Sequence, residues 1–123
     1  MVEQGSGLVI NVASHAAGTG KSPRSRSILP YSVGKAALHR MTADMATELR
    51  DSGVAVVSIW PPGSRTEGVL AEPDVWGDIS DWRPPLFTGR VVAAFAASGA
   101  WEGRSGEALV VDDLATELGV SGQ

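Results

Sequence analysis

The single tyrosine of this sequence, Tyr31, precedes Lys35 by four positions, a spacing that places both side chains on one face of a helix. A free tyrosine has a pKa of about 10, too high for a base at neutral pH, but a neighbouring ammonium ion favours the phenolate. Tyr31 could then exchange a proton with a hydroxyl or carbonyl group. Lys35 has donors for a ribose, and Ser14 could donate to a developing carbonyl oxygen. The spacing alone also fits an ordinary exposed helix face.

The segments that would position these residues alternate between apolar runs and helical patterns. Residues 8–13, 54–59 and 108–111 are apolar runs rich in β-branched residues, and they predict strands buried on both faces. Residues 31–50 and 88–97 have helical periodicity. Residues 15–30 and 64–86 contain many Gly, Pro, Ser or Asp residues and predict loops, the second with one short helical piece.

The first predicted helix has an apolar stripe at helical spacing, formed by Leu38, Met41, Met45 and Leu49. Gly53 is a plausible stop for this helix. In the second helix, Thr88 is a candidate N-cap and Gly99 a candidate stop. The residues after Asp112 predict a short, mostly polar tail.

The order strand, helix, strand, helix, strand predicts an α/β fold with a parallel sheet and right-handed crossovers. In such sheets ligands bind outside the carboxyl ends of the strands. Ser14 follows the first strand and the turn of residues 61–66 follows the second. We therefore expect both to lie on one rim of the sheet.

Several motifs in this order resemble the short-chain dehydrogenase/reductase family over nearly the whole chain. They are N-V-A-S at 11–14, Y-S-V-G-K at 31–35, E-L-R-D-S-G-V at 48–54 and W-P-P-G-S-R-T-E at 60–67. Residues 86–96 and 113–119 resemble most closely the subgroup of dehydrogenase/reductase family member 1. The resemblance implies an NAD(P)-dependent oxidoreductase that transfers a hydride between a secondary alcohol or carbonyl substrate and NAD or NADP.

The resemblance also implies residue roles. Ser14, Tyr31 and Lys35 match the catalytic residues, with Tyr31 as the acid/base and Asn11 as a structural residue of the strand. The residues that the resemblance places at the cofactor are Tyr31, Lys35, Pro61, Pro62, Gly63, Ser64 and Thr66.

Three features depart from the family pattern. The segment between Ser14 and Tyr31 is longer than usual, with an inserted stretch at residues 21–26, and Pro62 occupies the usual glycine position, where it has no N–H to offer. The glycine-rich strand–turn–helix that binds the pyrophosphate, the Asn-Ala-Gly segment and the fourth catalytic residue, an asparagine, are not found in the sequence. We therefore expect residues 1–123 to form a single partial domain: the last three strands of a Rossmann-like (doubly wound) parallel sheet with their helices, and the N-terminal nucleotide-binding half missing.

Composition argues against several other classes. The net charge of -4 without a Lys/Arg run gives no support for binding nucleic acid or anionic membranes. There is no cysteine, and with two histidines no metal-ligand cluster is visible. The N-terminus does not resemble a signal peptide, and no apolar stretch approaches the roughly 20 residues of a membrane span. We expect a cytoplasmic location by default.

Other signals have plainer interpretations. Residues 15–22 resemble a phosphate-binding P-loop, but His15 stands where the pattern needs glycine, so a loop near the active site is preferred. His15 could touch a substrate because it follows Ser14, but we expect it to be an exposed loop residue, and His39 to be a satisfied helix residue. Trp76 and Trp82 lie in the segment that would cover a substrate, as core residues or as a lid.

Two hypotheses follow. The first is the oxidoreductase with a small alcohol or carbonyl substrate. The second is a truncated, non-catalytic remnant or association module that cannot bind the dinucleotide alone. In either case we expect the isolated chain to form homo-oligomers or other associations, through an exposed edge of the first strand and the apolar stripe of the first helix.

Overall fold

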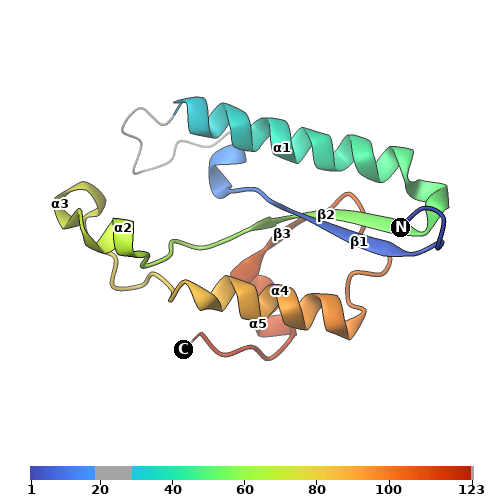
Figure 1. Ribbon diagram of the computed structural model, residues 1–123. Coiled ribbons are helices and arrows are strands. Elements are labelled where there is room, and N and C mark those ends of the chain that lie inside the picture. Colours follow the sequence, from blue (N-terminus) through green and yellow to red (C-terminus); the bar gives the residue numbers. More distant parts are fainter. Residues whose placement is uncertain (19–28, 123) are drawn as a thin grey trace.

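The computed structural model describes residues 1–18 and 29–122, and these form a parallel sheet between layers of helices (Figure 1). The three strands are β1 (Gly7–Val12), β2 (Val54–Trp60) and β3 (Ala108–Val110), in the order β1-β2-β3. Gly7 pairs with Val54 and Val12 with Ile59 in the first ladder, and Ser58 pairs with Ala108 in the second. The predicted α/β fold with a parallel sheet is confirmed.

The helices are α1 (Leu29–Glu48), α2 (Glu67–Leu70), α3 (Pro73–Trp76), α4 (Leu86–Ser98) and α5 (Val111–Glu117), with short 3-10 turns η1 (His15–Ala17) and η2 (Arg50–Ser52). Thr88 is not an N-cap, because α4 begins two residues before it. The prediction of a polar tail after Asp112 is also wrong, because this segment belongs to α5. Val111 and Leu114 of α5 are buried. These two side chains belong to the same buried cluster as the residues of α4. The sequence of the tail alone does not show this packing.

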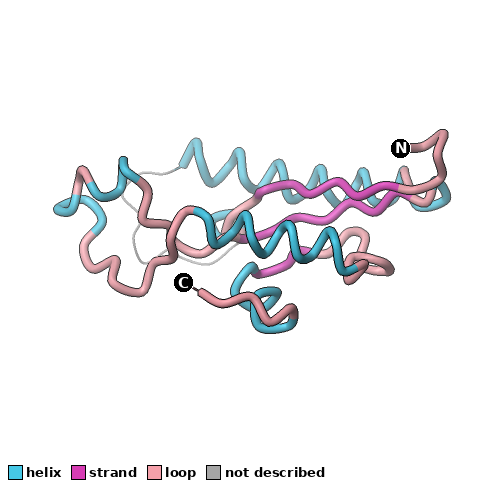
Figure 2. Tube along the Cα trace, turned by 60° about the horizontal axis from the view of Figure 1, so that its bottom comes forward, coloured by secondary structure: helices cyan, strands magenta, loops and turns pink. Residues whose placement is uncertain are grey.

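α1 covers one face of the sheet, and α4 and α5 cover the other (Figures 1 and 2). Successive side chains of β2 alternate between these layers. Val57 and Ile59 belong to the core cluster with α4 and α5, whereas Ser58 faces His39 of α1. The buried cluster consists of Val57, Ile59, Phe87, Val91, Phe95, Leu109, Val111, Leu114 and Ala115.

The two crossovers have opposite hands, because the strands follow one another in the same direction across the sheet while α1 and α4 lie on opposite faces. Figures 1 and 2 show a right-handed crossover through α1 and a left-handed one through α4. The expectation of right-handed crossovers is therefore wrong for the second. The preference for right-handed crossovers arises where a twisted strand is followed directly by a helix. Here residues 61–85 separate β2 from α4.

The face of α1 toward the sheet differs from the predicted stripe. Thr42 is its buried residue, and the Thr42 hydroxyl donates to the carbonyl of Leu38 and accepts from the Asn11 amide at 2.9 Å. Met41 is 43% exposed and does not belong to the packed face. Asn11 thus joins β1 to α1, in agreement with its interpretation as a structural residue. The helix ends earlier than predicted: α1 stops at Glu48, and Gly53 caps the 3-10 turn η2 that follows it. The φ of Gly53 is 71°, and a Cβ there would collide with the carbonyl oxygen of Gly5.

β1 is less buried than its apolar sequence predicts. Residues 7–11 are half-buried and Val12 is 48% exposed. Within the residues that the structure describes, β1 pairs with β2 alone and forms one edge of the sheet. None of the described helices is long and apolar enough to span a membrane.

Candidate active site

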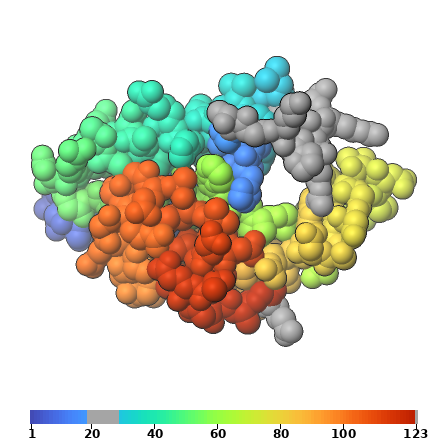
Figure 3. Space-filling model, turned by 180° about the vertical axis from the view of Figure 1, so that it is seen from behind, coloured from blue at the N-terminus to red at the C-terminus, as the bar shows by residue number. Residues whose placement is uncertain are grey.

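A cavity of about 450 Å³ lies at the carboxyl ends of β1 and β2. In Figure 3 its opening lies between η1 and the segment of α2 and α3. Four segments of the chain meet there: the end of β1 with η1, the first turns of α1, the turn after β2, and the tryptophans near α3. The lining residues are Val12, Ala13, Ser14, His15, Ala16, Tyr31, Lys35, Pro61, Pro62, Gly63, Trp76 and Trp82. The structure thus brings Ser14 and the first residues of the turn after β2 to one rim, as the topology predicted, and Tyr31 and Lys35 lie at the same cavity.

Tyr31 and Lys35 lie next to each other on α1. The Lys35 ammonium is 5.6 Å from the centroid of the Tyr31 ring, and it donates a hydrogen bond of 2.8 Å to the carbonyl of Val12. This bond fixes the first turns of α1 to the end of β1. The Tyr31 side chain remains about half exposed, at 51%. A cation therefore lies beside an accessible phenol, which is the geometry that the spacing predicted.

Ser14 is held at the rim by its backbone and its own turn. The N–H of Ala13 donates to the carbonyl of Ile59 at 2.9 Å and continues the β1–β2 pairing by one residue. Ser14 then caps η1, because its hydroxyl oxygen accepts from the N–H of Ala16 at 3.1 Å. That contact uses a lone pair and leaves the hydroxyl proton to donate to a ligand oxygen.

The turn after β2 is braced by the segment that precedes α4. The Gly63 carbonyl accepts from the N–H of Arg83 at 2.9 Å, and the N–H of Arg65 donates to the Arg83 carbonyl at 2.9 Å. The Trp82 ring occupies the space that a Cβ on Gly63 would need. A glycine is thus required at position 63 by close packing, and Pro61, Pro62 and Gly63 form one wall of the cavity.

Ser64 and Thr66 are not among the residues that line the cavity. Ser64 forms a parallel bridge with Arg83. The Thr66 hydroxyl caps α2 by accepting from the N–H of Val69 at 3.4 Å. The structure therefore separates these two predicted cofactor residues from the other five.

Sequence reasoning gave too small a role to the aromatic residues. Trp76 and Trp82 contact each other with ring centroids 5.8 Å apart, and both line the cavity. His15 is exposed, as expected, but it also lines the cavity and packs against Trp60. His39 packs against the same ring. A regular pattern could not reveal these contacts, because they join a turn, a strand and a helix.

The cavity is apolar and aromatic, with its charge on one side. Among the described residues that line it, Lys35 is the one Lys or Arg, and none is a carboxylate. Arg83, behind the turn, is paired with Asp112 at 2.9 Å. In the part of the chain that the structure describes, no group of three or more His, Cys, Asp or Glu side chains could hold a metal ion. The P-loop pattern ends at residues 21 and 22, which lie outside the described residues, and its first residues form the 3-10 turn η1.

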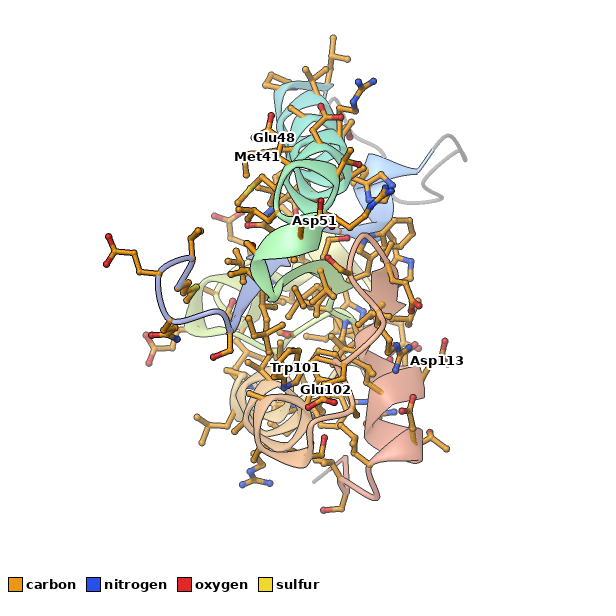
Figure 4. The ribbon with its side chains drawn as sticks, turned by 90° about the vertical axis from the view of Figure 1, so that its right-hand side faces the viewer. Met41, Glu48, Asp51, Trp101, Glu102 and Asp113 are labelled. Carbon is orange, nitrogen blue, oxygen red and sulfur yellow. The ribbon has the colours of Figure 1, made fainter. Side chains whose placement is uncertain are left out.

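A second cavity, of about 460 Å³, lies at the opposite end of the sheet, where Arg50, Trp101 and Glu102 contribute to its wall. Figure 4 looks onto this end and labels Trp101 and Glu102 beside α4. None of the predicted site residues lines it. We therefore place the candidate site at the cavity that contains Ser14, Tyr31 and Lys35, although the two cavities are of similar size.

A parallel sheet whose carboxyl ends gather a serine, a tyrosine and a lysine defines a Rossmann-like α/β protein with a polar site on its rim. The family model described as short chain dehydrogenase matches residues 1–73, which is more than half of the chain. The chain belongs to the short-chain dehydrogenase/reductase family.

Individual relatives agree with this assignment. Dehydrogenase/reductase SDR family member 1 of Mus musculus is 35% identical over 132 residues, covering 98% of this chain and 41% of the mouse protein. The crystal structure of the TT0495 protein from Thermus thermophilus has a TM-score of 0.73 and 27% identity, covering 89% of this chain and 48% of that one. A putative NAD(P) dependent gluconate 5-dehydrogenase from Beutenbergia cavernae, with bound NADP, has a TM-score of 0.68 and 26% identity, covering 90% of this chain and 46% of that one.

The chain thus spans less than half of the length of each of these three proteins. The match to the family model begins at residue 1, and it argues against our expectation that the nucleotide-binding half of the fold is missing.

Proposed function

We propose that the protein is an NAD(P)-dependent oxidoreductase that interconverts a secondary alcohol and a carbonyl compound. The observation that carries this proposal is the meeting of Tyr31, Lys35 and Ser14 at one cavity beside the turn of Pro61, Pro62 and Gly63. When bound, the nicotinamide cofactor supplies or accepts the hydride. The bound NADP of the Beutenbergia cavernae structure supports this cofactor class.

The residues of the cavity fit the nicotinamide end of such a cofactor. The Lys35 ammonium has three donors, and one of them is used by the Val12 carbonyl. The other two can bind ribose hydroxyls. The wall of Pro61, Pro62 and Gly63 offers a flat apolar surface to a nicotinamide ring. Pro62 has no N–H, so this wall contributes packing there instead of a hydrogen bond.

In the direction of carbonyl reduction, Tyr31 would donate its phenolic proton to the carbonyl oxygen of the substrate. In the direction of oxidation, the phenolate removes the alcohol proton. Lys35 lies beside this proton-transfer group, with its ammonium 5.6 Å from the Tyr31 ring centroid. Ser14 donates its hydroxyl proton to the same substrate oxygen and holds it near Tyr31.

The substrate side of the cavity is formed by Trp76 and Trp82. We propose that these rings act as a lid over the substrate, because they contact each other and both line the cavity. An apolar, aromatic wall without carboxylates favours a carbonyl compound with an apolar substituent over a cationic one.

The proposal is tested by turnover. The protein should oxidise NADH or NADPH in the presence of carbonyl compounds with apolar substituents. The reaction is measured by the loss of absorbance of the reduced nicotinamide. No turnover with either cofactor, over a panel of ketones and aldehydes and over the matching alcohols in reverse, would contradict the proposed function.

The affinity of the 123-residue chain for the dinucleotide is expected to be weak. The sequence contains no glycine-rich turn of the type that binds the pyrophosphate at a helix N-terminus. We expect isothermal titration calorimetry of the isolated chain with NAD or NADP to give a dissociation constant above about 1 mM, which corresponds to about -4 kcal/mol. Micromolar binding would show that these residues hold the dinucleotide unaided.

The exposed edge of β1 favours a second candidate function, an association module. An unpaired strand edge is a template for pairing with another chain, and β1 carries no charged residue from Gly7 to Val12. We expect the isolated chain to form dimers or larger species by size-exclusion chromatography with light scattering. A monodisperse species of 12.7 kDa with a cooperative thermal transition would contradict this prediction.

A further inference from the structure

Trp60, the last residue of β2, lies between the two histidines of the chain. Its ring contacts His15 edge to face, with centroids 5.3 Å apart and planes at 75°. It contacts His39 in the same manner, at 5.9 Å and 73°. His15 belongs to η1 and directly follows Ser14, while His39 belongs to α1, two turns after Tyr31. The indole therefore connects the turn that carries the serine to the helix that carries the tyrosine.

The turn η1 lies against α1, and few bonds fix it to the sheet. None of its three residues is buried, and its internal bonds run between residues 14 and 18. The hydrogen bond from the Ala13 N–H to the Ile59 carbonyl fixes the start of the turn to β2. Beyond Ser14, η1 is joined to β2 by the ring contact between His15 and Trp60.

Packing, and not hydrogen bonding, holds the indole. Its Nε1 is buried, yet no described residue accepts a hydrogen bond from it. An unpaired buried donor destabilises the folded state, so the two ring contacts must be favourable enough to keep a tryptophan here. Edge-to-face aromatic contacts are favourable at centroid distances of about 4.5–7 Å, and both contacts of Trp60 fall in this range.

We propose that Trp60 is a positioning residue that sets the distance between the Ser14 hydroxyl and the Tyr31 phenol. It acts through His15 on the serine turn and through His39 on α1, and it does not line the cavity itself. Both hydroxyls must reach one substrate oxygen, so a shift of the serine turn lowers the rate of the chemical step. This inference rests on the proposed function.

The test is a double-mutant cycle on the rate of the chemical step in the natural protein. Trp60→Leu keeps an apolar side chain but removes the ring, and we expect kcat to fall about 10- to 100-fold while KM for cofactor and substrate changes less than about 3-fold. In the Ser14→Ala background, Trp60→Leu should lower kcat less than about 3-fold, because the hydroxyl that it positions is absent. Trp60→Phe retains an aromatic edge without the unpaired donor and should restore most of the lost rate.

Trp101→Phe is the matched control, since Trp101 lies at the opposite end of the sheet (Figure 4) and lines the other cavity; its kcat should stay within about 2-fold of the wild type. If Trp60→Leu does not fold, His39→Leu removes the other ring contact of Trp60, at a residue that does not line the cavity, and it is tested in the same double-mutant cycle. Equal losses of kcat in the wild-type and Ser14→Ala backgrounds would overturn the inference. If Ser14→Ala alone leaves kcat unchanged, the proposed function fails, and the inference falls with it.

Discussion

Replacement of Tyr31 by phenylalanine is expected to lower kcat of the natural protein by about 10²- to 10⁴-fold, the range of a lost general acid or base. The substitution removes one oxygen atom and keeps the ring that packs beside Lys35. Cofactor affinity should be unchanged, because the Lys35 ammonium and the wall of Pro61, Pro62 and Gly63 remain. Single-turnover kinetics with NADPH and a fluorescence titration of the cofactor measure the two quantities separately.

Val33→Ala serves as the control for this substitution. Val33 lies two residues further along α1, is 59% exposed and does not line the cavity, so its kcat should stay within about 2-fold of the wild type. A Tyr31→Phe enzyme with more than about a tenth of the wild-type rate would show that the phenol is not the acid or base.

The main elements of the fold could be predicted because each depends on local patterns. Continuous β-branched runs predicted β1 and β2, and helical periodicity predicted α1. The predictions of secondary structure and of buried faces fail where tertiary packing determines them. α5 exists because α4 covers Val111 and Leu114, and Thr42 replaces Met41 on the packed face because Asn11 hydrogen-bonds to it.

The predicted site residues divide in the same way. Ser14 and the turn after β2 could be placed on one rim because parallel strands end there, whereas Tyr31 and Lys35 were grouped with Ser14 by the family resemblance. The displacement of Thr66 into a helix cap could not be foreseen, since it depends on where α2 begins. The packing of Trp82 on Gly63 joins two residues through an irregular segment, for which no periodic pattern exists.

The site also depends on the layer on the far side of the sheet. Val57 and Ile59 of β2 pack against Phe95 of α4, and β2 ends in Trp60 and the turn of residues 61–63. Phe95 is fully buried, with 0% exposure, and the Arg104 guanidinium lies 5.9 Å from its ring centroid. The position of the cavity wall therefore rests on packing that involves no residue of the site.

Phe95→Ala is accordingly expected to lower the free energy of unfolding of the natural protein by about 3–5 kcal/mol, the cost of deleting a buried aromatic ring and leaving a cavity. This is a large part of the about 5–15 kcal/mol by which domains are stable, so activity should be lost at a lower temperature than in the wild type. Leu86→Ala, in the same helix but 70% exposed, should change stability by less than about 0.5 kcal/mol. Chemical denaturation of both variants measures the difference, and equal, small losses would show that α4 does not pack on the sheet through Phe95.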